Sequence, residues 1–137
     1  MSETNKALMR RFVEEVQTQH NLGAFETFID PAFVNHDPLP GLPGTLEGAK
    51  ELHRMLFAAF PDLQMTIDDM AAEGEKVWTR KTATGTHQGE LFGIPATGKR
   101  VSWKVIDVVT YKNRKITEHW VVADTLSLLQ QLGAVPQ

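Results

Sequence analysis

The chain has 137 residues, of which 42% are hydrophobic and 23% charged, and its 17 acidic against 14 basic side chains give a formal net charge of −3. This size and apolar content predict one globular domain over residues 1–137 and argue against a multidomain protein. The near-balanced charge argues against general binding to nucleic acids or anionic membranes. The absence of cysteine excludes disulfides, thiol nucleophiles and thiolate metal sites.

The N-terminal segment carries charges throughout and lacks the apolar core of a signal peptide. The longest purely apolar run covers only residues 55–60, whereas crossing a bilayer takes about 20 apolar residues. We therefore expect a soluble, cytoplasmic chain without membrane partners.

Three helices are predicted in the first half of the chain. The first carries an apolar stripe at helical spacing and ends at Gly23; the stripe comprises Leu8, Met9, Phe12, Val13 and Val16. A short second helix over residues 24–29 ends before Pro31, because a residue that precedes proline avoids the helical region. Residues 35–44 hold three of the seven prolines and form no regular element. The third helix starts after Thr45 and ends before Pro61.

The second half of the chain predicts strands. Alternating apolar and polar residues begin at Leu63, and a second strand covers residues 77–86. A long, glycine-rich loop over residues 87–100 leads to a hairpin of residues 101–111 and 115–122. A short helix capped by Asp124 or Thr125 ends at Gly133. Helices followed by strands predict an α+β fold in which helices cover one face of a curved antiparallel sheet, with a small-molecule pocket between the two.

Asp107 is the most informative polar residue, because it interrupts an otherwise apolar strand. A carboxylate buried among apolar side chains is costly, and desolvation would raise its pKa toward that of a useful general base. The alternative is a structural aspartate, or one on the outer face of the sheet paired with Lys104 or with a partner chain.

The register of the predicted hairpin decides which residue Asp107 meets. With a two-residue turn at Asn113 and Arg114, Asp107 lies opposite Trp120 and His119 faces the other way. A loop longer by one residue would place Asp107 opposite Val121, on the same face as His119. Only in the second arrangement could Asp107 and His119 share a proton as base and orienting group.

Several further residues are candidates for the site, each with a structural alternative. His36 lies before the proline-rich turn, and Arg80 could donate to a substrate carbonyl or pair with an acid on the surface. His87 begins the glycine-rich loop, and Asp124 is also a good helix cap. Aromatic side chains could line a pocket or simply fill the core: Trp78, Trp103, Trp120 and Phe92. No metal is predicted, because the histidines lack the spacing of known metal motifs.

Four segments together resemble one protein family: FVNHDP at 33–38, AFPDL at 59–63, GTHQGELFGIPATGK at 85–99 and KITEHWVVADTLSLLQQLG at 115–133. The chain resembles the SnoaL-like polyketide cyclases, or ester cyclases, of the NTF2-like superfamily. This resemblance implies a cone-shaped α+β barrel with three N-terminal helices on the concave side of the sheet and a short C-terminal helix. It also implies a homodimer formed through the sheet and an apolar substrate bound without metal or organic cofactor.

The best-known members of this family close a ring in a polyketide ester by intramolecular aldol chemistry. The resemblance places their acid/base aspartate at Val121 and their helping histidine at Asp107. Valine cannot transfer a proton, so the acid/base function has either moved to another residue or been lost.

We therefore expect a cofactor-independent cyclase or isomerase that acts on a small apolar carbonyl compound by proton abstraction. In this hypothesis Asp107 is the base, His119 or His36 orients it, and Arg80 stabilises the developing oxyanion. One alternative is a non-catalytic dimer that binds small molecules on the same scaffold. Another is an epoxide or ester hydrolase, for which a cluster of Arg80, Asp107 and Asp124 would be the sign.

Overall fold

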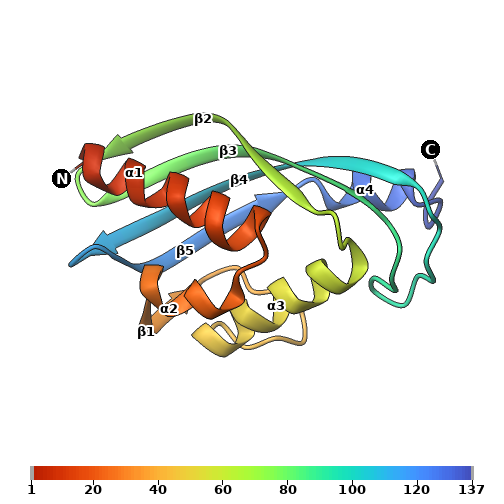
Figure 1. The fold of residues 1–137 in the computed structure, drawn as a ribbon, viewed down its shortest axis with the longest axis horizontal. Coiled ribbons are helices and arrows are strands. Elements are labelled where there is room, and N and C mark those ends of the chain that lie inside the picture. Colours follow the sequence, from red (N-terminus) through yellow and green to blue (C-terminus); the bar gives the residue numbers. More distant parts are fainter. Residues whose placement is uncertain (1, 137) are drawn as a thin grey trace.

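The computed structural model describes residues 2–136 and consists of a curved sheet with helices on its concave side (Figure 1). The helices are α1 (Ser2–Phe12), α2 (Phe25–Phe28), α3 (Leu46–Ala59) and α4 (Thr125–Gln131). The strands are β1 (Ile29–Asn35), β2 (Gln64–Glu73), β3 (Lys76–Thr86), β4 (Arg100–Lys112) and β5 (Lys115–Ala123). The predicted α+β class is therefore confirmed.

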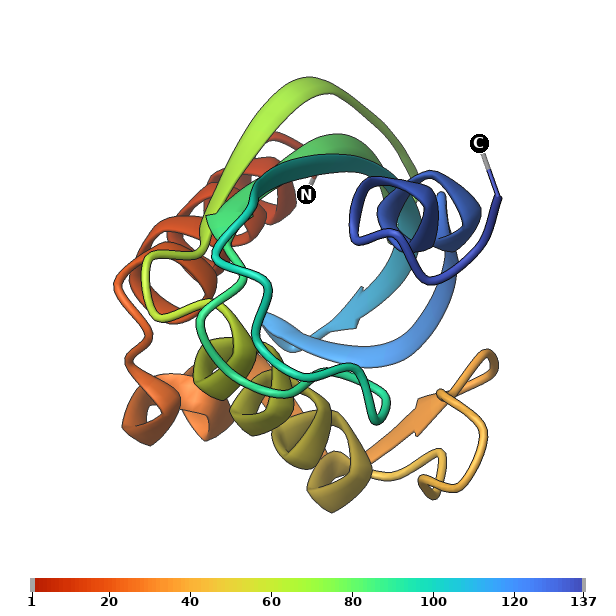
Figure 2. The same ribbon diagram turned by 90° about the vertical axis from the view of Figure 1, so that its right-hand side faces the viewer.

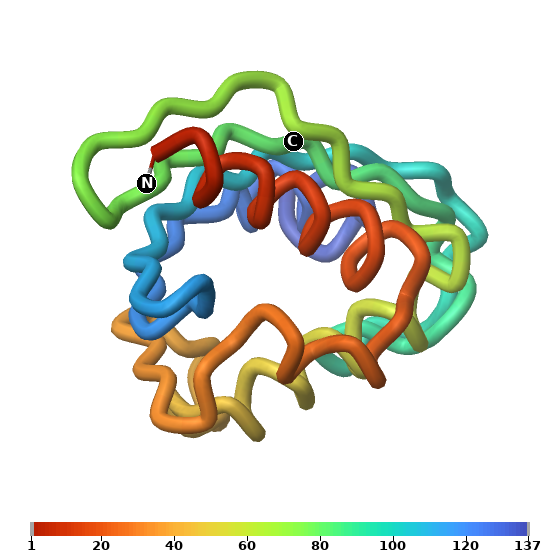
Figure 3. The backbone as a smooth tube through the Cα atoms, turned by 60° about the vertical axis from the view of Figure 1, so that its left-hand side comes forward, coloured from red at the N-terminus to blue at the C-terminus, as the bar shows by residue number. Residues whose placement is uncertain are grey.

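The strands lie in the order β1-β5-β4-β3-β2, and all neighbours are antiparallel except the parallel pair β1 and β5. Seen from one end, the sheet curls into an incomplete ring (Figure 2), and α3 and the β3–β4 loop lie on the side that it leaves open. Helix α1 runs across this opening, with the segment from α2 to α3 below it (Figure 3). Within residues 2–136, none of the helices combines the length and apolar character needed to cross a membrane.

The structure differs from the expected elements in two places. The first helix continues after α1 as a π-helical turn over Val13–Thr18 and ends before His20, whose φ of 59° interrupts helical geometry. Residues 29–35 form strand β1, which the sequence did not indicate because Pro31 lies within it. Proline is tolerated there because β1 is an edge strand, which has one side free of ladder hydrogen bonds.

A β-bulge sets the register of the β4–β5 hairpin. Lys112 pairs with Lys115 across a two-residue turn, but the register shifts by one between Thr110 and Tyr111, which leaves Thr117 as the extra residue. Asp107 consequently lies opposite Val121 rather than Trp120. The turn therefore has two residues, as in the first predicted alternative. Asp107 nevertheless lies opposite Val121 and on the same face of the sheet as His119, as in the second.

The inward side chains of the sheet form two buried apolar clusters. One packs α1 and α2 against β3 and β4 and includes Phe12, Phe25 and Val109. The other lies near the C-terminal end of α3 and includes Phe60 and Trp103. Burial alternates strictly along β3 and β4: the odd-numbered residues from 77 to 85 and from 101 to 109 are buried. The same alternation turns the few polar residues at odd-numbered positions toward the interior.

Gly48 allows the first turn of α3 to approach the proline-rich segment closely. Thr45 caps the helix by accepting a hydrogen bond from the Gly48 backbone N–H at 3.3 Å. A Cβ atom at Gly48 would overlap the carbonyl oxygen of Pro43. The segment before α3 is therefore held against the helix by contact between two backbones.

We expect Gly48→Ala to destabilise the protein by about 1–3 kcal/mol, although alanine favours helix by about 1 kcal/mol over glycine. Gly23→Ala is the control, since a Cβ there meets only the Asn21 side chain at 3.4 Å. Urea unfolding of both variants measures the effect. A Gly48→Ala variant as stable as the parent would show that the close approach does not constrain α3.

Candidate functional site

A cavity of about 330 Å³ lies between the concave face of the sheet and helices α1 and α3. Most of its walls are apolar and come from both buried clusters, with Phe12, Phe25 and Trp103 among them. Its polar side chains include Lys81, Asp107 and His119. An apolar cavity with a few convergent polar groups is the usual form of a small-molecule site.

Lys81 and Asp107 form a buried ion pair inside this cavity. The Lys81 Nζ atom lies 2.8 Å from Asp107 Oδ2, and the two residues are 1% and 5% exposed. The strands position them, because Lys81 on β3 and Asp107 on β4 lie two residue pairs apart on the inner face. Removing two charges from water is costly, so each charge here depends on the other for compensation.

His119 extends this pair on the next strand. Its Nε2 atom lies 3.4 Å from Asp107 Oδ2, and its Nδ1 atom lies 3.3 Å from Asn35 Oδ1 on β1. Both ring nitrogens thus face oxygen atoms, an arrangement that a protonated imidazole satisfies with two N–H donors. The bulge brings this about, because Ile116 before it and His119 after it both line the cavity.

On its other side, the Lys81 ammonium is held by Gln17, whose amide group contacts His53 in turn. The His53 Nδ1 atom lies 2.8 Å from the Ala49 carbonyl oxygen and therefore carries the proton, which leaves Nε2 as an acceptor. The Gln17 amide nitrogen lies 3.2 Å from that Nε2 atom, and the Gln17 Oε1 atom accepts from Lys81 Nζ at 3.3 Å. This chain of donors and acceptors fixes the orientation of the Gln17 amide.

The charges in the cavity correct the expectation of a raised pKa at Asp107. Burial alone would raise the pKa of Asp107, but the Lys81 charge and the His119 hydrogen bond outweigh it and lower that pKa to about 2. Burial lowers the pKa of His53 to about 4, assisted by the nearby Lys81 charge. At neutral pH the site therefore contains an ionised Asp107 and a neutral His53.

The structure brings some of the predicted site residues together and separates others. Trp103 and Phe92 line the cavity together with Asp107 and His119. Arg80 and Trp78 are exposed on the outer face of β3, because the alternation along this strand turns Lys81 inward instead. The cation of the cavity is thus Lys81, and the expected role of Arg80 is corrected.

His36 and Trp120 lie together outside the cavity. Their rings stack with centroids 4.6 Å apart, and His36 Nε2 lies 3.0 Å from Glu118 Oε2. His36 does not contact Asp107, so of the two expected orienting groups only His119 is in place. Trp120 faces away from His119 because successive residues of a strand point to opposite sides of the sheet.

The other two predicted residues support local structure. Buried His87 accepts from the Thr97 backbone N–H through Nδ1 at 3.2 Å, inside the β3–β4 loop. Asp124 caps α4 by accepting from the Ser127 backbone N–H at 3.0 Å. The expected cluster of Arg80, Asp107 and Asp124 does not form, since only Asp107 lies in the cavity.

Lys81, Gln17 and His53 are polar residues of the cavity that the sequence reading missed. The sequence held a signal for Lys81, because Lys81 lies an even number of residues from Val77 and Ala83 and therefore points to the same side of β3. Gln17 carried no such signal: it faces inward from a π-helical turn, and π-turns are frequent at functional sites.

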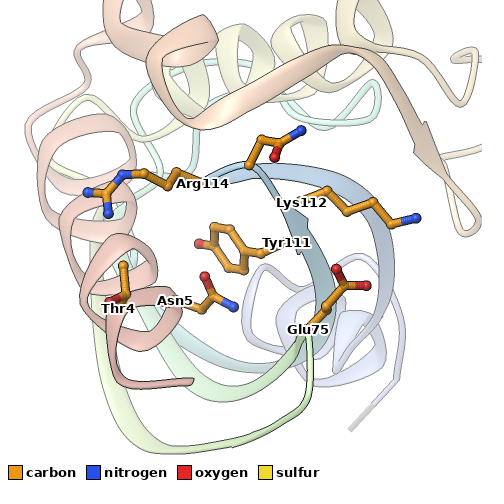
Figure 4. Close-up of a pocket in the computed structure, with 7 residues that line it drawn as sticks. Thr4, Asn5, Glu75, Tyr111, Lys112 and Arg114 are labelled. Atoms are coloured by element: carbon orange, nitrogen blue, oxygen red, sulfur yellow. The ribbon is translucent and has the colours of Figure 1, made fainter. Parts of the chain in front are cut away.

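A second pocket, of about 300 Å³, lies beside the β4–β5 turn and is lined mainly by polar residues (Figure 4). The Tyr111 ring forms part of it, and its hydroxyl has no hydrogen-bond partner among the described residues. None of the predicted site residues lines this pocket. Within residues 2–136, no group of three or more histidine or carboxylate side chains could hold a metal ion.

Comparison with known proteins places this architecture in a family. A family model described as SnoaL-like polyketide cyclase matches residues 7–132. The aklanonic acid methyl ester cyclases DauD of Streptomyces sp. (strain C5) and DnrD of Streptomyces peucetius are each 27% identical over 132 residues. These matches cover 92% of this chain, 80% of DauD and 88% of DnrD.

The crystal structure of AclR from Streptomyces galilaeus is similar with a TM-score of 0.88 and 30% identity. That match covers 100% of this chain and 89% of AclR. The family model spans the second half of α1, the other three α-helices, the whole sheet and the cavity residues from Met9 to Leu128. On this evidence the chain belongs to the SnoaL-like polyketide cyclase family and has its NTF2-like α+β fold.

Proposed function

We propose that this protein closes a ring in an apolar carbonyl compound related to aklanonic acid methyl ester, by intramolecular aldol chemistry without a cofactor. The observation that carries the proposal is the contact of Lys81, Asp107 and His119 inside an otherwise apolar cavity. The two curated cyclases named for that ester support the substrate class. Apolar walls favour a ring-bearing substrate, and the polar cluster is suited to its oxygen atoms.

The charge state of the site favours His119 over Asp107 as the group that takes the proton. A carboxylate with a pKa of about 2 is a weak base, whereas an imidazole beside it can accept a proton from carbon. In the neutral imidazole Nε2–H donates to Asp107 and Nδ1 is the nitrogen that takes the proton, so the substrate replaces Asn35 Oδ1 beside Nδ1 during the reaction. The ionised Asp107 then stabilises the imidazolium that forms. Asp107 thus acts as the partner of the base.

Lys81 is suited to stabilise the negative charge that develops on the substrate oxygen. An ammonium group has three N–H donors, and contacts with Asp107 and Gln17 use two of them. The remaining donor is available to an enolate oxygen in a water-poor cavity, where such stabilisation is strongest. Lys81 therefore replaces Arg80 in the role that the sequence suggested.

The reaction balances within one substrate molecule. His119 takes a proton from the carbon next to one carbonyl, and the resulting enolate carbon forms a bond to a second carbonyl carbon. The oxygen of that carbonyl becomes an alkoxide and takes the proton back from His119. The product is a ring-closed isomer of the substrate, and the cavity contributes by holding the two reacting carbons close together.

A carboxylate is retained beside the position of Val121, although in this proposal it assists the base rather than acting as the base. Asp107 lies directly opposite Val121, and such pairs have Cβ atoms about 4.5–5.5 Å apart. A carboxylate at position 107 is therefore within one strand spacing of the position that the family resemblance assigned to the acid. This proximity favours a rearranged acid/base site, with His119 as the base and Asp107 as its partner, over the loss of the function.

We predict that His119→Gln lowers kcat/KM for aklanonic acid methyl ester by at least about 100-fold, because proton transfer of this kind contributes about 10²–10⁴-fold. Conversion to an isomer of equal mass is followed by chromatography without added metal or cofactor. Asp69→Asn, at an exposed carboxylate on β2, serves as the control. Binding of the ester without conversion by the parent protein would instead identify a non-catalytic binding protein.

Lys81→Met should destabilise the protein by about 3–5 kcal/mol, because it leaves the Asp107 charge buried without its partner. The double variant Lys81→Met/Asp107→Leu should recover most of that loss while remaining inactive. Urea unfolding measures both, and Lys104→Met at a surface pair with Asp68 is the control, with an expected change below about 1 kcal/mol. Equal losses in the single and double variants would contradict a coupled buried pair.

His53 should make stability fall as the pH decreases from 6.5 to 4. The unfolded chain protonates His53 near pH 6.5, whereas the folded chain does so only near its pKa of about 4. The unfolded state therefore binds more protons across this range, and about 3 kcal/mol of stability is lost through this residue at most. His53→Gln should flatten the pH dependence of the unfolding free energy. An unchanged slope would mean that His53 protonates equally easily in both states.

A further inference from the structure

The β3–β4 loop is firmly attached to the rest of the protein at both sides of its tip. The backbone N–H groups of Gln88 and Gly89 donate to the Ala59 carbonyl at 2.9 and 3.1 Å, which fixes the loop to the end of α3. His87 exchanges backbone hydrogen bonds with Lys99 and Gly98 at the base of the loop. Leu91, next to the tip, is 2% exposed and belongs to a buried cluster.

The tip is a two-residue turn that contains an unfavourable backbone conformation. Leu91 and Ile94 exchange backbone hydrogen bonds of 3.1 and 2.8 Å, and the residues between them have φ angles of 50° at Phe92 and 79° at Gly93. Glycine adopts such angles freely, but a bulky aromatic residue there is a genuine outlier. Such strain persists only where the surrounding structure imposes it, as the anchored loop does here.

Phe92 combines this strain with an unusual position. It lines the cavity and yet remains 42% exposed, so it lies where the cavity meets solvent. The proline-rich segment contributes further apolar residues to the same cavity: Pro38, Leu39 and Pro40. The ion pair of Lys81 and Asp107, in contrast, is almost fully buried. The cavity therefore has an apolar, partly open end and a charged interior.

We propose that Phe92 is a specificity-determining residue that binds the ring system of the ligand at the open end of the cavity. The ligand then has its carbonyl oxygens near Lys81 and His119 and its apolar body against Phe92. The strained turn is retained because it holds the aromatic ring in this position, at the expense of stability. The catalytic part of this inference rests on the proposed function, whereas the binding part does not.

A second turn of the same kind provides a matched control. Asn113 and Arg114 connect β4 and β5 with φ angles of 51° and 65°, so Arg114 has the same kind of strain as Phe92. Arg114 does not line the cavity. Replacing Arg114 with glycine therefore relieves backbone strain without altering the proposed ligand contact.

The test uses a neutral planar probe, 1-aminoanthracene, whose binding is followed by methyl NMR signals of the cavity residues Leu52, Val105 and Ile116. Phe92→Ala and Phe92→Asn should each weaken binding about tenfold, whereas Phe92→Tyr and Arg114→Gly should stay within about threefold of the parent. Because asparagine tolerates positive φ, Phe92→Asn should melt about 3 °C above Phe92→Ala, and Arg114→Gly about 3 °C above the parent.

With aklanonic acid methyl ester, Phe92→Ala should raise KM about tenfold and change kcat less than threefold. Unchanged probe binding in Phe92→Ala would overturn the proposed contact, and equal melting temperatures of Phe92→Ala and Phe92→Asn would overturn the proposed strain. If the parent does not convert the ester but the probe results hold, the proposed reaction fails while the role of Phe92 in binding stands.

Discussion

The buried ion pair between Lys81 and Asp107 is the interaction on which the rest of the site depends. Neither charge could remain in the apolar interior without the other, and together they set the charge state of the polar groups in the cavity. The pair keeps Asp107 ionised, and its carboxylate in turn faces His119. The chemistry of the cavity is thus decided by a cation that lies on a different strand from the acid.

The surrounding elements maintain this pair from two directions. On one side, a backbone carbonyl of α3 fixes the tautomer of His53, which orients the Gln17 amide toward Lys81. On the other side, β1 contributes Asn35 to His119. Helices and edge strand therefore do more than cover the sheet, because they supply the polar partners that a buried charge requires.

The sequence predicted those features that depend on local pattern. Alternation identified the β4–β5 hairpin, and a carboxylate within an apolar run singled out Asp107. The bulge at Thr117 could not be predicted, because it exists only in the pairing of two strands. Strand β1 was missed because Pro31 disfavours strands in general, and only its edge position permits it. His53 lies four residues after Ala49 and three before Leu56, on the apolar stripe of α3, but a single histidine in such a stripe does not by itself indicate a site.

The extra residue at Thr117 also bears on how the site could change during evolution. After Thr117, the odd-numbered side chains of β5 point into the cavity. A point substitution cannot change which side of the sheet a position faces. An acidic group can nevertheless pass from β5 to the facing position on β4 by two substitutions, one at each strand. The two positions have Cβ atoms about 4.5–5.5 Å apart, so side chains from either strand can reach the same region of the cavity although they occupy different columns of an alignment.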